Sequence, residues 1–257
     1  MSRSALAAGI LALNVAFVLM SAPPAVAQAT EFRVLASAGV KPAVTALLPQ
    51  AEHSIGQGVA TEFGASKTLK QKIQAGGVFD VAILTAENID DLIRQGKIAA
   101  NTRTDVARTG IGVGIRAGAP KPDISTPEAL KQALLNAKSI ALNPDGASTA
   151  YFYKVLAHLG IAEDVKSKFI LDPVLERLQM NVAEGKAELL IALIPEILDS
   201  QGVELAGPLP GDLQSYVNFA AGVATNTHNA EAAKALIMFI TAPAAAPLLK
   251  AKGLEPR

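Results

Sequence analysis

The sequence predicts an α/β fold in which short strands alternate with amphipathic helices. From Glu31 onward, short apolar runs are followed by helix-length runs whose apolar residues recur at three- and four-residue spacing. The run Phe79–Leu84 is continuously apolar, as in a parallel strand that is buried on both faces. Glycines at Gly76, Gly77 and Gly96 end the helical runs. This repeated order is typical of a doubly wound α/β domain.

The first half of the chain contains three strand–helix units. The expected strands are 32–36, 59–63 and 79–84, and the expected helices are 42–50, 68–75 and 89–95. The segment Val106–Arg116 departs from this order, because glycines alternate with apolar residues at 111–115 and Gly118, Pro120 and Pro122 follow. Flexible backbone beside a stiff proline segment predicts a crossover between two domains.

A second series begins at Thr126-Pro127-Glu128, where an N-cap residue precedes a proline at the first helical position. The expected strands are 139–142, 169–171, 188–194 and 216–224, and the expected helices are 149–159, 175–183, 230–240 and 244–250. Residues 207–211 are expected to form a turn-rich connector.

Two crossovers that contain glycine predict a molecule with two lobes. Lobe 1 comprises residues 28–110 and 220–257, and lobe 2 comprises residues 111–219, with hinges near Gly112 and Gly222. Two lobes joined by two hinge strands can close on a ligand. The alternative is one rigid α/β domain of about 230 residues.

The N-terminal residues predict export. Arg3 precedes the uncharged apolar run Ser4–Met20, and Ala25-Val26-Ala27 is a small-x-small cleavage site. A membrane-spanning anchor needs about 20 apolar residues, and Pro23-Pro24 interrupt this run first. We expect a signal peptide at 1–27, a mature start at Gln28 or, as second choice, Thr30, and a periplasmic location.

Composition narrows the classes of partner. Removing Arg3 with the signal peptide leaves 22 basic residues against 23 acidic ones, so no positive field favours nucleic acid. The absence of cysteine from the sequence excludes disulfides, and the fold must depend on its hydrophobic core. The three histidines are far apart and show no metal-ligand spacing, so neither a metal nor another cofactor is expected.

Candidate ligand contacts lie in the loops that follow the strands, because ligands of open α/β sheets bind beyond the carboxyl ends of the strands. These loops are Ser37-Ala38-Gly39, Ala65-Ser66-Lys67-Thr68, Gly146-Ala147-Ser148-Thr149 and Asp172-Pro173-Val174-Leu175. Free N–H groups at helix starts favour an anion, and Lys67 adds a positive charge beside Ser66. The alternative is that Ser66, Thr68 and Ser148 are plain N-caps.

Several segments resemble one family over essentially the whole mature chain. Ile73–Leu84 resembles the "IEAGAPADVFIS" segment of the molybdate-binding-protein family of periplasmic solute receptors, which serve ABC importers. Phe63–Leu69 resembles its serine-rich second loop, and Leu175–Ile191 resembles its late helix, glycine turn and strand. Gly207–Pro210 and Ala251–Pro256 are similar to a broader, divergent branch. The resemblance implies the type II periplasmic binding protein fold, with two doubly wound sheets joined by two hinge crossovers.

The resemblance also implies ligand contacts at particular positions. Ser66 matches the second-loop serine of the family, whereas the first-loop serine falls on Gly39, for which Ser37 could substitute. Two family positions whose backbone N–H groups donate to the ligand fall on Ser148, which is followed by Thr149, and on Leu175.

The oxyanion-binding tyrosine of the family falls on Leu193, which has no hydroxyl group. We expect a small anionic ligand, either an oxyanion or an organic carboxylate. Because Lys67 adds a charge that the family's site lacks, a carboxylate is favoured over molybdate. The expected function is capture of this anion by a monomer that presents it to the membrane subunits of an ABC importer, with no catalytic residue.

Two other classes compete with this interpretation. Residues 146–150 approach the G-x-S-x-G nucleophile elbow, so Ser148 could act in a hydrolase with Asp172 or Asp199 and His228. This motif ends in Ala150 rather than glycine. A structural or interaction protein without a ligand is the other class, because fold alone does not give function.

Overall fold

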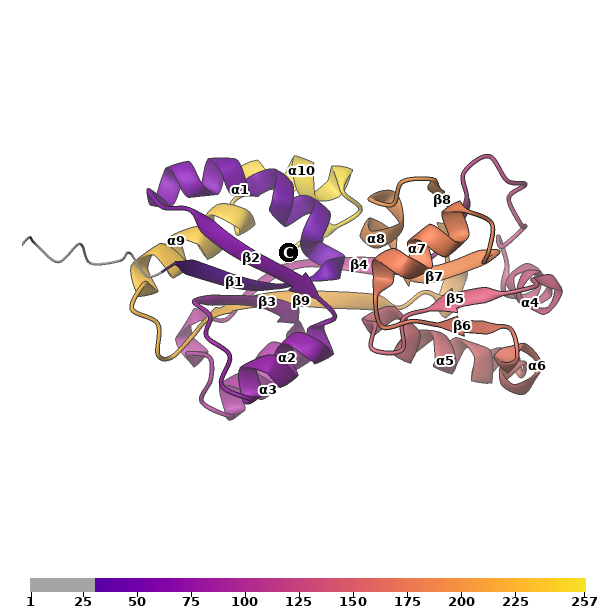
Figure 1. The fold of residues 1–257 in the computed structure, drawn as a ribbon, viewed down its shortest axis with the longest axis horizontal. Helices are drawn as coiled ribbons and strands as arrows, with labels where there is room; N and C mark the ends of the chain where they lie inside the picture. The colour runs from indigo at the N-terminus through magenta and orange to yellow at the C-terminus, as the bar shows by residue number, and fades with distance from the viewer. Residues whose placement is uncertain (1–30) are drawn as a thin grey trace, which may run out of the picture. The chain divides into compact units, whose positions relative to one another are not determined.

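The computed structural model describes residues 31–257, so the predicted signal peptide and its cleavage site lie outside the described residues. Residues 31–257 form ten strands and ten α-helices, with helices on both faces of a mixed sheet (Figure 1). The strands are β1 Phe32–Ser37, β2 Val59–Gly64, β3 Val81–Thr85, β4 Thr104–Arg116, β5 Ile140–Leu142, β6 Phe169–Leu171, β7 Leu189–Leu193, β8 Val203–Pro208, β9 Tyr216–Val223 and β10 Glu255–Pro256. The helices are α1 Lys41–Ile55, α2 Ser66–Gln74, α3 Ala86–Arg94, α4 Pro127–Asn136, α5 Ala147–Leu159, α6 Ala162–Lys166, α7 Leu175–Ala183, α8 Ile194–Leu198, α9 Ala230–Thr241 and α10 Ala246–Ala251.

The strand order of the sheet is β2-β1-β3-β9-β4-β7-β5-β6, and β8 and β10 also pair with β4. Strand β1 is parallel to β2 and β3, and β5 is parallel to β6 and β7. Strands β9 and β4 run antiparallel to their neighbours between these two groups. The predicted α/β class is therefore confirmed, with antiparallel strands at the centre.

Strand β4 changes partners along its length. Its residues 104–110 pair with β9, whereas residues 111–116 pair with β7 and β8. The chain returns from the second group of strands to the first between β8 and β9, in residues 209–215. The Gln214 side chain binds β4 at the change of partner, accepting from Ile111 N at 2.9 Å and donating to Ile111 O at 3.0 Å.

Alternate residues of each strand face different helices, as the two-residue repeat of a strand requires. Val34 of β1 and Ile83 of β3 pack in the core that includes α1 and α9. Leu35 and Leu84, on the opposite face, pack with α2 and α3. Figure 1 shows these two pairs of helices on opposite faces of the sheet.

Most predicted elements are present, with shifted ends. Helix α1 continues through Pro49 to Ile55, well beyond the predicted 42–50. The prediction missed α6, α8, β8 and β10, because segments of two to six residues carry too little periodicity to be recognised. The predicted connector 207–211 is wrong at its start, since β8 extends to Pro208.

The glycines expected at hinges have a packing reason in the structure. A Cβ atom on Gly222 would lie 2.5 Å from Cγ2 of Ile98, and one on Gly112 would lie 2.7 Å from Cδ1 of Leu205. Neither glycine has a positive φ angle. Close approach of buried side chains, rather than backbone freedom, explains why these positions hold glycine.

We therefore predict that Gly222→Ala lowers the free energy of unfolding by about 1–3 kcal/mol, the usual cost of overpacking a core. Gly58→Ala is the matched control, because its Cβ would meet no atom within 4 Å. That variant should be neutral or slightly stabilising. Urea unfolding of both variants tests the prediction, and equal stability of Gly222→Ala and wild type would contradict it.

Candidate functional site

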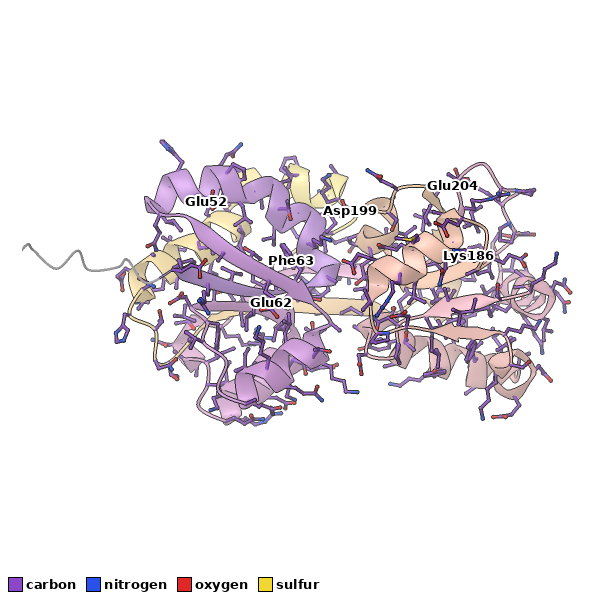
Figure 2. The ribbon with its side chains drawn as sticks, viewed as in Figure 1. Glu52, Glu62, Phe63, Lys186, Asp199 and Glu204 are labelled. Atoms are coloured by element: carbon purple, nitrogen blue, oxygen red, sulfur yellow. The ribbon has the colours of Figure 1, made fainter. Side chains whose placement is uncertain are left out.

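A cavity of about 250 Å³ lies where β1, β2, β5 and β7 end at their carboxyl edges. It is bordered by both groups of strands that share β4. Figure 2 shows Phe63, one of its apolar lining residues, on β2. Its lining includes the hydroxyl groups of three serines, two carboxyl groups, one amide and three large apolar side chains. These residues are Ser37, Ser66, Ser148, Glu176, Glu196, Asn143, Phe63, Leu175 and Leu193.

Three helices, α2, α5 and α7, begin at this cavity. Their N-cap residues are Ala65, Gly146 and Val174, and none of the three caps forms a side-chain hydrogen bond to its helix. The first N–H groups of a helix have no partner inside the helix, so here they are left for water or a ligand. Together with the positive ends of the helix dipoles, they favour an anion.

The three serines do not cap these helices, so the plain N-cap alternative is wrong for Ser66 and Ser148. Ser66 is the first residue of α2, and its Oγ accepts from Thr85 N at 3.2 Å. The Ser37 Oγ accepts from Gly39 N at 3.4 Å, and the Ser148 hydroxyl forms no hydrogen bond within residues 31–257. All three side chains are buried, and each hydroxyl can still donate its hydrogen to a ligand.

Gly39 lies beside the cavity but does not line it. A Cβ atom on Gly39 would lie 2.6 Å from Cδ1 of Leu193 and 2.7 Å from Cζ of Phe219. A serine at this position would therefore displace Leu193. The side chains of Leu193 and Phe219 together occupy the space that a residue larger than glycine at position 39 would need.

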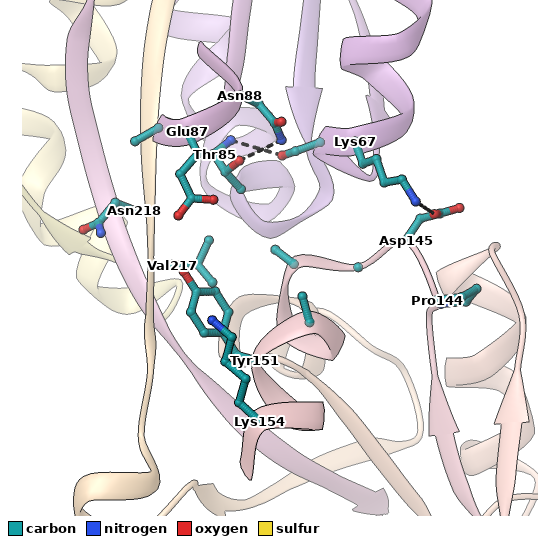
Figure 3. A pocket seen from close by; sticks show the side chains of 15 residues that line it. Lys67, Thr85, Glu87, Asn88, Pro144, Asp145, Tyr151, Lys154, Val217 and Asn218 are labelled. Atoms are coloured by element: carbon teal, nitrogen blue, oxygen red, sulfur yellow. Dashed lines mark hydrogen bonds and ion pairs between the residues drawn. The ribbon is translucent and has the colours of Figure 1, made fainter. Parts of the chain in front are cut away.

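Lys67 is placed differently from the sequence-based expectation. Its Nζ lies 2.8 Å from Asp145 Oδ1, its side chain is 60% exposed, and it lines a neighbouring cavity of about 380 Å³. Figure 3 shows this ion pair between α2 and the loop before α5. Thr149 lines neither cavity, and its Oγ1 is buried without a hydrogen-bond partner in the described part of the chain.

The neighbouring cavity carries charges of both signs. Glu87 of α3 points toward Tyr151 of α5 (Figure 3). Burial raises the pKa of Tyr151, and the charge of Glu87 raises it further. Lys154 Nζ lies 5.3 Å from the centre of the Tyr151 ring. A negative ligand in this cavity would meet the carboxylates of Glu87 and Asp145 as well as the cations of Lys67 and Lys154.

Sequence reasoning missed Glu196, the third residue of α8. Its Oε2 accepts from Leu193 N at 3.0 Å. Burial raises the pKa of Glu196 to about 7, and the nearby negative charge of Glu176 adds to this, whereas the Leu193 N–H acts in the opposite direction. A glutamate three residues after a strand end, with Pro195 before it, is the sequence signal of a helix start that would have drawn attention to it.

Glu176 is the second carboxylate of the cavity, and it was also missed. Lys41 of α1 pairs with it at 3.4 Å, and the Glu176 side chain is 63% exposed. Lys41 itself is not among the residues that line the cavity. Within residues 31–257, the lining of this cavity includes no lysine, arginine or histidine, so the donors it offers to a ligand are neutral.

The hydrolase alternative fails on the position of its histidine. His228 lies in the loop whose residues Thr227 and Asn229 donate to the carboxylate of Asp80. Asp80 directly precedes β3, at the amino edge of the sheet. Ser148 lies in the cavity at the carboxyl edge. The two residues are therefore on opposite edges of the sheet, and no triad can form.

The two candidate acids of that triad are also engaged elsewhere or exposed. Asp172 Oδ2 lies 2.9 Å from Arg177 Nε, and Asp199 is an exposed residue at the end of α8. No histidine lines either cavity of residues 31–257 described above. A Ser–His mechanism at Ser148 is therefore not supported.

Residues 31–257 contain no group of three or more His, Cys, Asp or Glu side chains that could hold a metal ion. No single helix of residues 31–257 is long and apolar enough to cross a membrane. One pair of helices, 230–241 with 243–251, has the length and composition of a membrane span only if its 50° bend is ignored.

Comparison with known proteins identifies the class. A model of the bacterial extracellular solute-binding protein family matches residues 32–255, and the chain belongs to this family. It is 28% identical over 250 residues to an aconitate isomerase of Pseudomonas sp., covering 94% of each chain. It is 29% identical over 231 residues to the molybdate-binding protein ModA of Azotobacter vinelandii, covering 88% of this chain and 90% of that protein.

Solved structures confirm the fold. The periplasmic molybdate-binding protein of Azotobacter vinelandii superposes with a TM-score of 0.75 at 18% identity, over 88% of this chain and all of that one. The sulfate-binding protein SubI of Mycobacterium tuberculosis H37Rv gives 0.71 at 18% identity, over 88% of this chain and 87% of that one. The predicted type II periplasmic binding protein fold and the resemblance to molybdate-binding proteins are confirmed.

The raised pKa of Glu196 predicts a pH-dependent stability. The folded protein holds this proton up to about pH 7, whereas the unfolded chain releases it near 4.5. The stabilisation of the folded state by this proton is therefore fully present below the pKa of the unfolded chain, and it is lost as pH rises through the pKa of the folded protein. We expect the free energy of unfolding of wild type, relative to Glu196→Gln, to fall by about 3 kcal/mol between those values.

Urea unfolding at several pH values measures this difference. Glu204→Gln is the matched control, because Glu204 lies outside the cavity, on β8 (Figure 2), where it pairs with Lys121. It should keep the wild-type profile. A constant difference between wild type and Glu196→Gln across this range would contradict the prediction.

Proposed function

We propose that the protein is a periplasmic receptor that captures a small anion, an organic carboxylate, in the cavity of about 250 Å³. One observation carries this proposal: three helix N-termini without side-chain caps and three buried serine hydroxyls meet in a single cavity. Such neutral donors bind an anion without a compensating buried cation.

Two features favour a carboxylate over an inorganic oxyanion. Phe63, Leu175 and Leu193 give the cavity apolar walls that suit the carbon skeleton of an organic acid. Leu193 also lacks the hydroxyl group with which the resembling family holds its oxyanion. The names of the relatives agree with an anion in general, because molybdate, sulfate and aconitate are all anions.

The proposed mechanism is closure of two lobes on the ligand. We assign lobe 1 to residues 28–110 and 220–257 and lobe 2 to 111–219, and strand pairing supports moving the return to about residue 216. The ion pairs Lys41–Glu176 and Lys67–Asp145 join the two groups of strands and are partly exposed. A ligand that contacts both lobes only when they are closed shifts the population to the closed state. The closed monomer would then dock on the membrane subunits of an ABC importer.

A second candidate function is isomerisation of an unsaturated carboxylate such as aconitate. It is favoured by the identity to aconitate isomerase over 94% of both chains, together with an acid of pKa about 7 in the cavity. A group that titrates near neutrality suits general acid–base catalysis. Glu196 would take a proton from the methylene carbon next to the double bond and return it to the far alkene carbon. The double bond moves by one position, and the proton count does not change.

For the receptor, we predict that a true ligand from a panel of sulfate, molybdate, citrate, propane-1,2,3-tricarboxylate and the two aconitates raises Tm by roughly 5–10 °C at 100 times its Kd. The carboxylates should exceed the two inorganic oxyanions. Ser148→Ala should weaken binding by about 1.5–3 kcal/mol, because a hydroxyl bonded to a charged ligand is lost. Ser54→Ala, on the exposed face of α1, is the control and should leave affinity unchanged.

Lys67→Met and Asp145→Asn form a second matched pair in the same titration. If Lys67 acts through its ion pair, both variants should lose the same small amount of binding free energy, about 0.2–1 kcal/mol. A much larger loss for Lys67→Met would mean that Lys67 contacts the ligand directly, as the sequence suggested. If none of the anions binds, the proposal that the protein is a receptor is contradicted.

The isomerase has a separate test. Purified protein is incubated with cis-aconitate and the trans isomer is followed by chromatography, with Glu204→Gln as the control for fold. The isomerase predicts turnover that Glu196→Gln abolishes and Glu204→Gln retains. Tight binding of aconitate without conversion would leave the protein a receptor.

A further inference from the structure

The anion-binding cavity contains two carboxyl groups, and one of them is poised to face the ligand. Glu196 Oε2 accepts from Leu193 N at 3.0 Å, which fixes the carboxyl group at the start of α8. Its other oxygen, Oε1, forms no hydrogen bond with any residue of 31–257. Both Glu196 and the three serines line the same cavity. An anion held by the serines would therefore share this cavity with a carboxyl oxygen that has no hydrogen-bond partner among residues 31–257.

Charged groups near Glu196 do not neutralise it. Glu176 of α7 lines the cavity and is negative, and Lys41 at the start of α1 pairs with Glu176. The other charged side chains of the neighbouring segments have their own partners: Arg177 with Asp172, Glu204 with Lys121, and Glu255 with Arg108. An ionised Glu196 would thus repel an anionic ligand in a partly buried site.

We propose that Glu196 binds a proton together with the anion, so that the cavity takes up one proton for each carboxylate ligand. This inference rests on the proposed capture of an anion in this cavity. The protonated carboxyl group would donate its O–H to an oxygen of the ligand, a charge-assisted hydrogen bond. The repulsion between Glu196 and the ligand then becomes an attraction. The carboxyl O–H of Glu196 supplies the donor that a hydroxyl group at position 193 would have supplied.

Glu196 is a better proton carrier than Glu176. The Glu176 side chain is 63% exposed and pairs with Lys41, so water and a cation are already in contact with it. Glu196 is partly buried, and burial with the charge of Glu176 raises its pKa to about 7 before any ligand is bound. A bound anion adds a further negative charge and raises the pKa of Glu196 again.

The consequence is an affinity that depends on pH with a defined sign. Below the pKa of the free protein, the proton is already present and affinity does not change with pH. Above it, up to the higher pKa of the complex, affinity falls by up to about tenfold for each pH unit. A ligand captured at mildly acidic pH would be released more readily at alkaline pH.

The experiment is calorimetric titration of the full mature protein with propane-1,2,3-tricarboxylate and with sulfate, between about pH 7 and pH 9, where both probes are ionised. The tricarboxylate has no double bond, so isomerisation cannot contribute heat. Repeating the titration in buffers of different ionisation enthalpy counts the protons that are taken up. For wild type we expect up to one proton per ligand and a loss of affinity of up to about a hundredfold over this range.

Glu196→Gln should abolish both effects, because the amide can accept from Leu193 N and donate toward the ligand at every pH. Its affinity should stay constant and exceed that of wild type at pH 9. Glu204→Gln should keep the wild-type slope. A wild type that binds without proton uptake, with the same slope as Glu196→Gln, overturns the inference and leaves the receptor intact. Binding of neither probe at any pH, to wild type or variant, overturns both.

A second measurement does not depend on the variant. In wild type at pH 8, the infrared difference spectrum should gain a protonated carboxyl band when the tricarboxylate binds. If the probe binds and this band does not grow, the inference is overturned even where Glu196→Gln fails to fold.

Discussion

Strand β4 is shared by two groups of strands, and the placement of every candidate ligand contact depends on that sharing. Its first half pairs with β9 and its second half with β7 and β8. The Gln214 side chain holds both backbone groups of Ile111 at the change of partner, and Gly110 has no Cβ that would collide with it. Because β4 is continuous, the carboxyl edges of β1 and β2 face those of β5 and β7, and the loops from both groups converge on one cavity.

The helices that begin at the proposed anion site have no side-chain caps. A side-chain cap stabilises a helix by about 1 kcal/mol, and α2, α5 and α7 all forgo it where they meet the cavity. Helix α4 is capped by Thr126, but α6, α9 and α10, which begin away from the cavity, also have no side-chain cap. What distinguishes α2, α5 and α7 is that all three begin at one cavity. The serines beside them add donors without adding charge, and the two lysines nearby are paired, Lys67 with Asp145 and Lys41 with Glu176.

Leu193 links the shape of the cavity to its electrostatics. Its side chain, together with that of Phe219, packs where a Cβ on Gly39 would lie. Its backbone N–H holds the carboxyl group of Glu196, the acid that we propose as the proton-carrying partner of the ligand. Apolar walls with an acid of near-neutral pKa suit a carboxylate, whose charge can be shared with a proton.

The sequence by itself determined the α/β class, the order of most elements and the loops in which ligand contacts would lie. Periodicity and glycine stops are local signals, and the position of helix starts after strands follows from them. Five of the eight predicted residues, Ser37, Ser66, Ser148, Leu175 and Leu193, line the cavity.

Only the tertiary structure decided the rest. The pairing of Lys67 with Asp145 joins residues 78 positions apart, and no local pattern encodes it. The importance of Glu196 likewise arises from burial and from Glu176, 20 residues earlier in the chain, because a pKa depends on what surrounds a group in space. The reason for glycine at positions 112 and 222 is also tertiary: the side chains that exclude a Cβ there come from β8 and from the segment before β4.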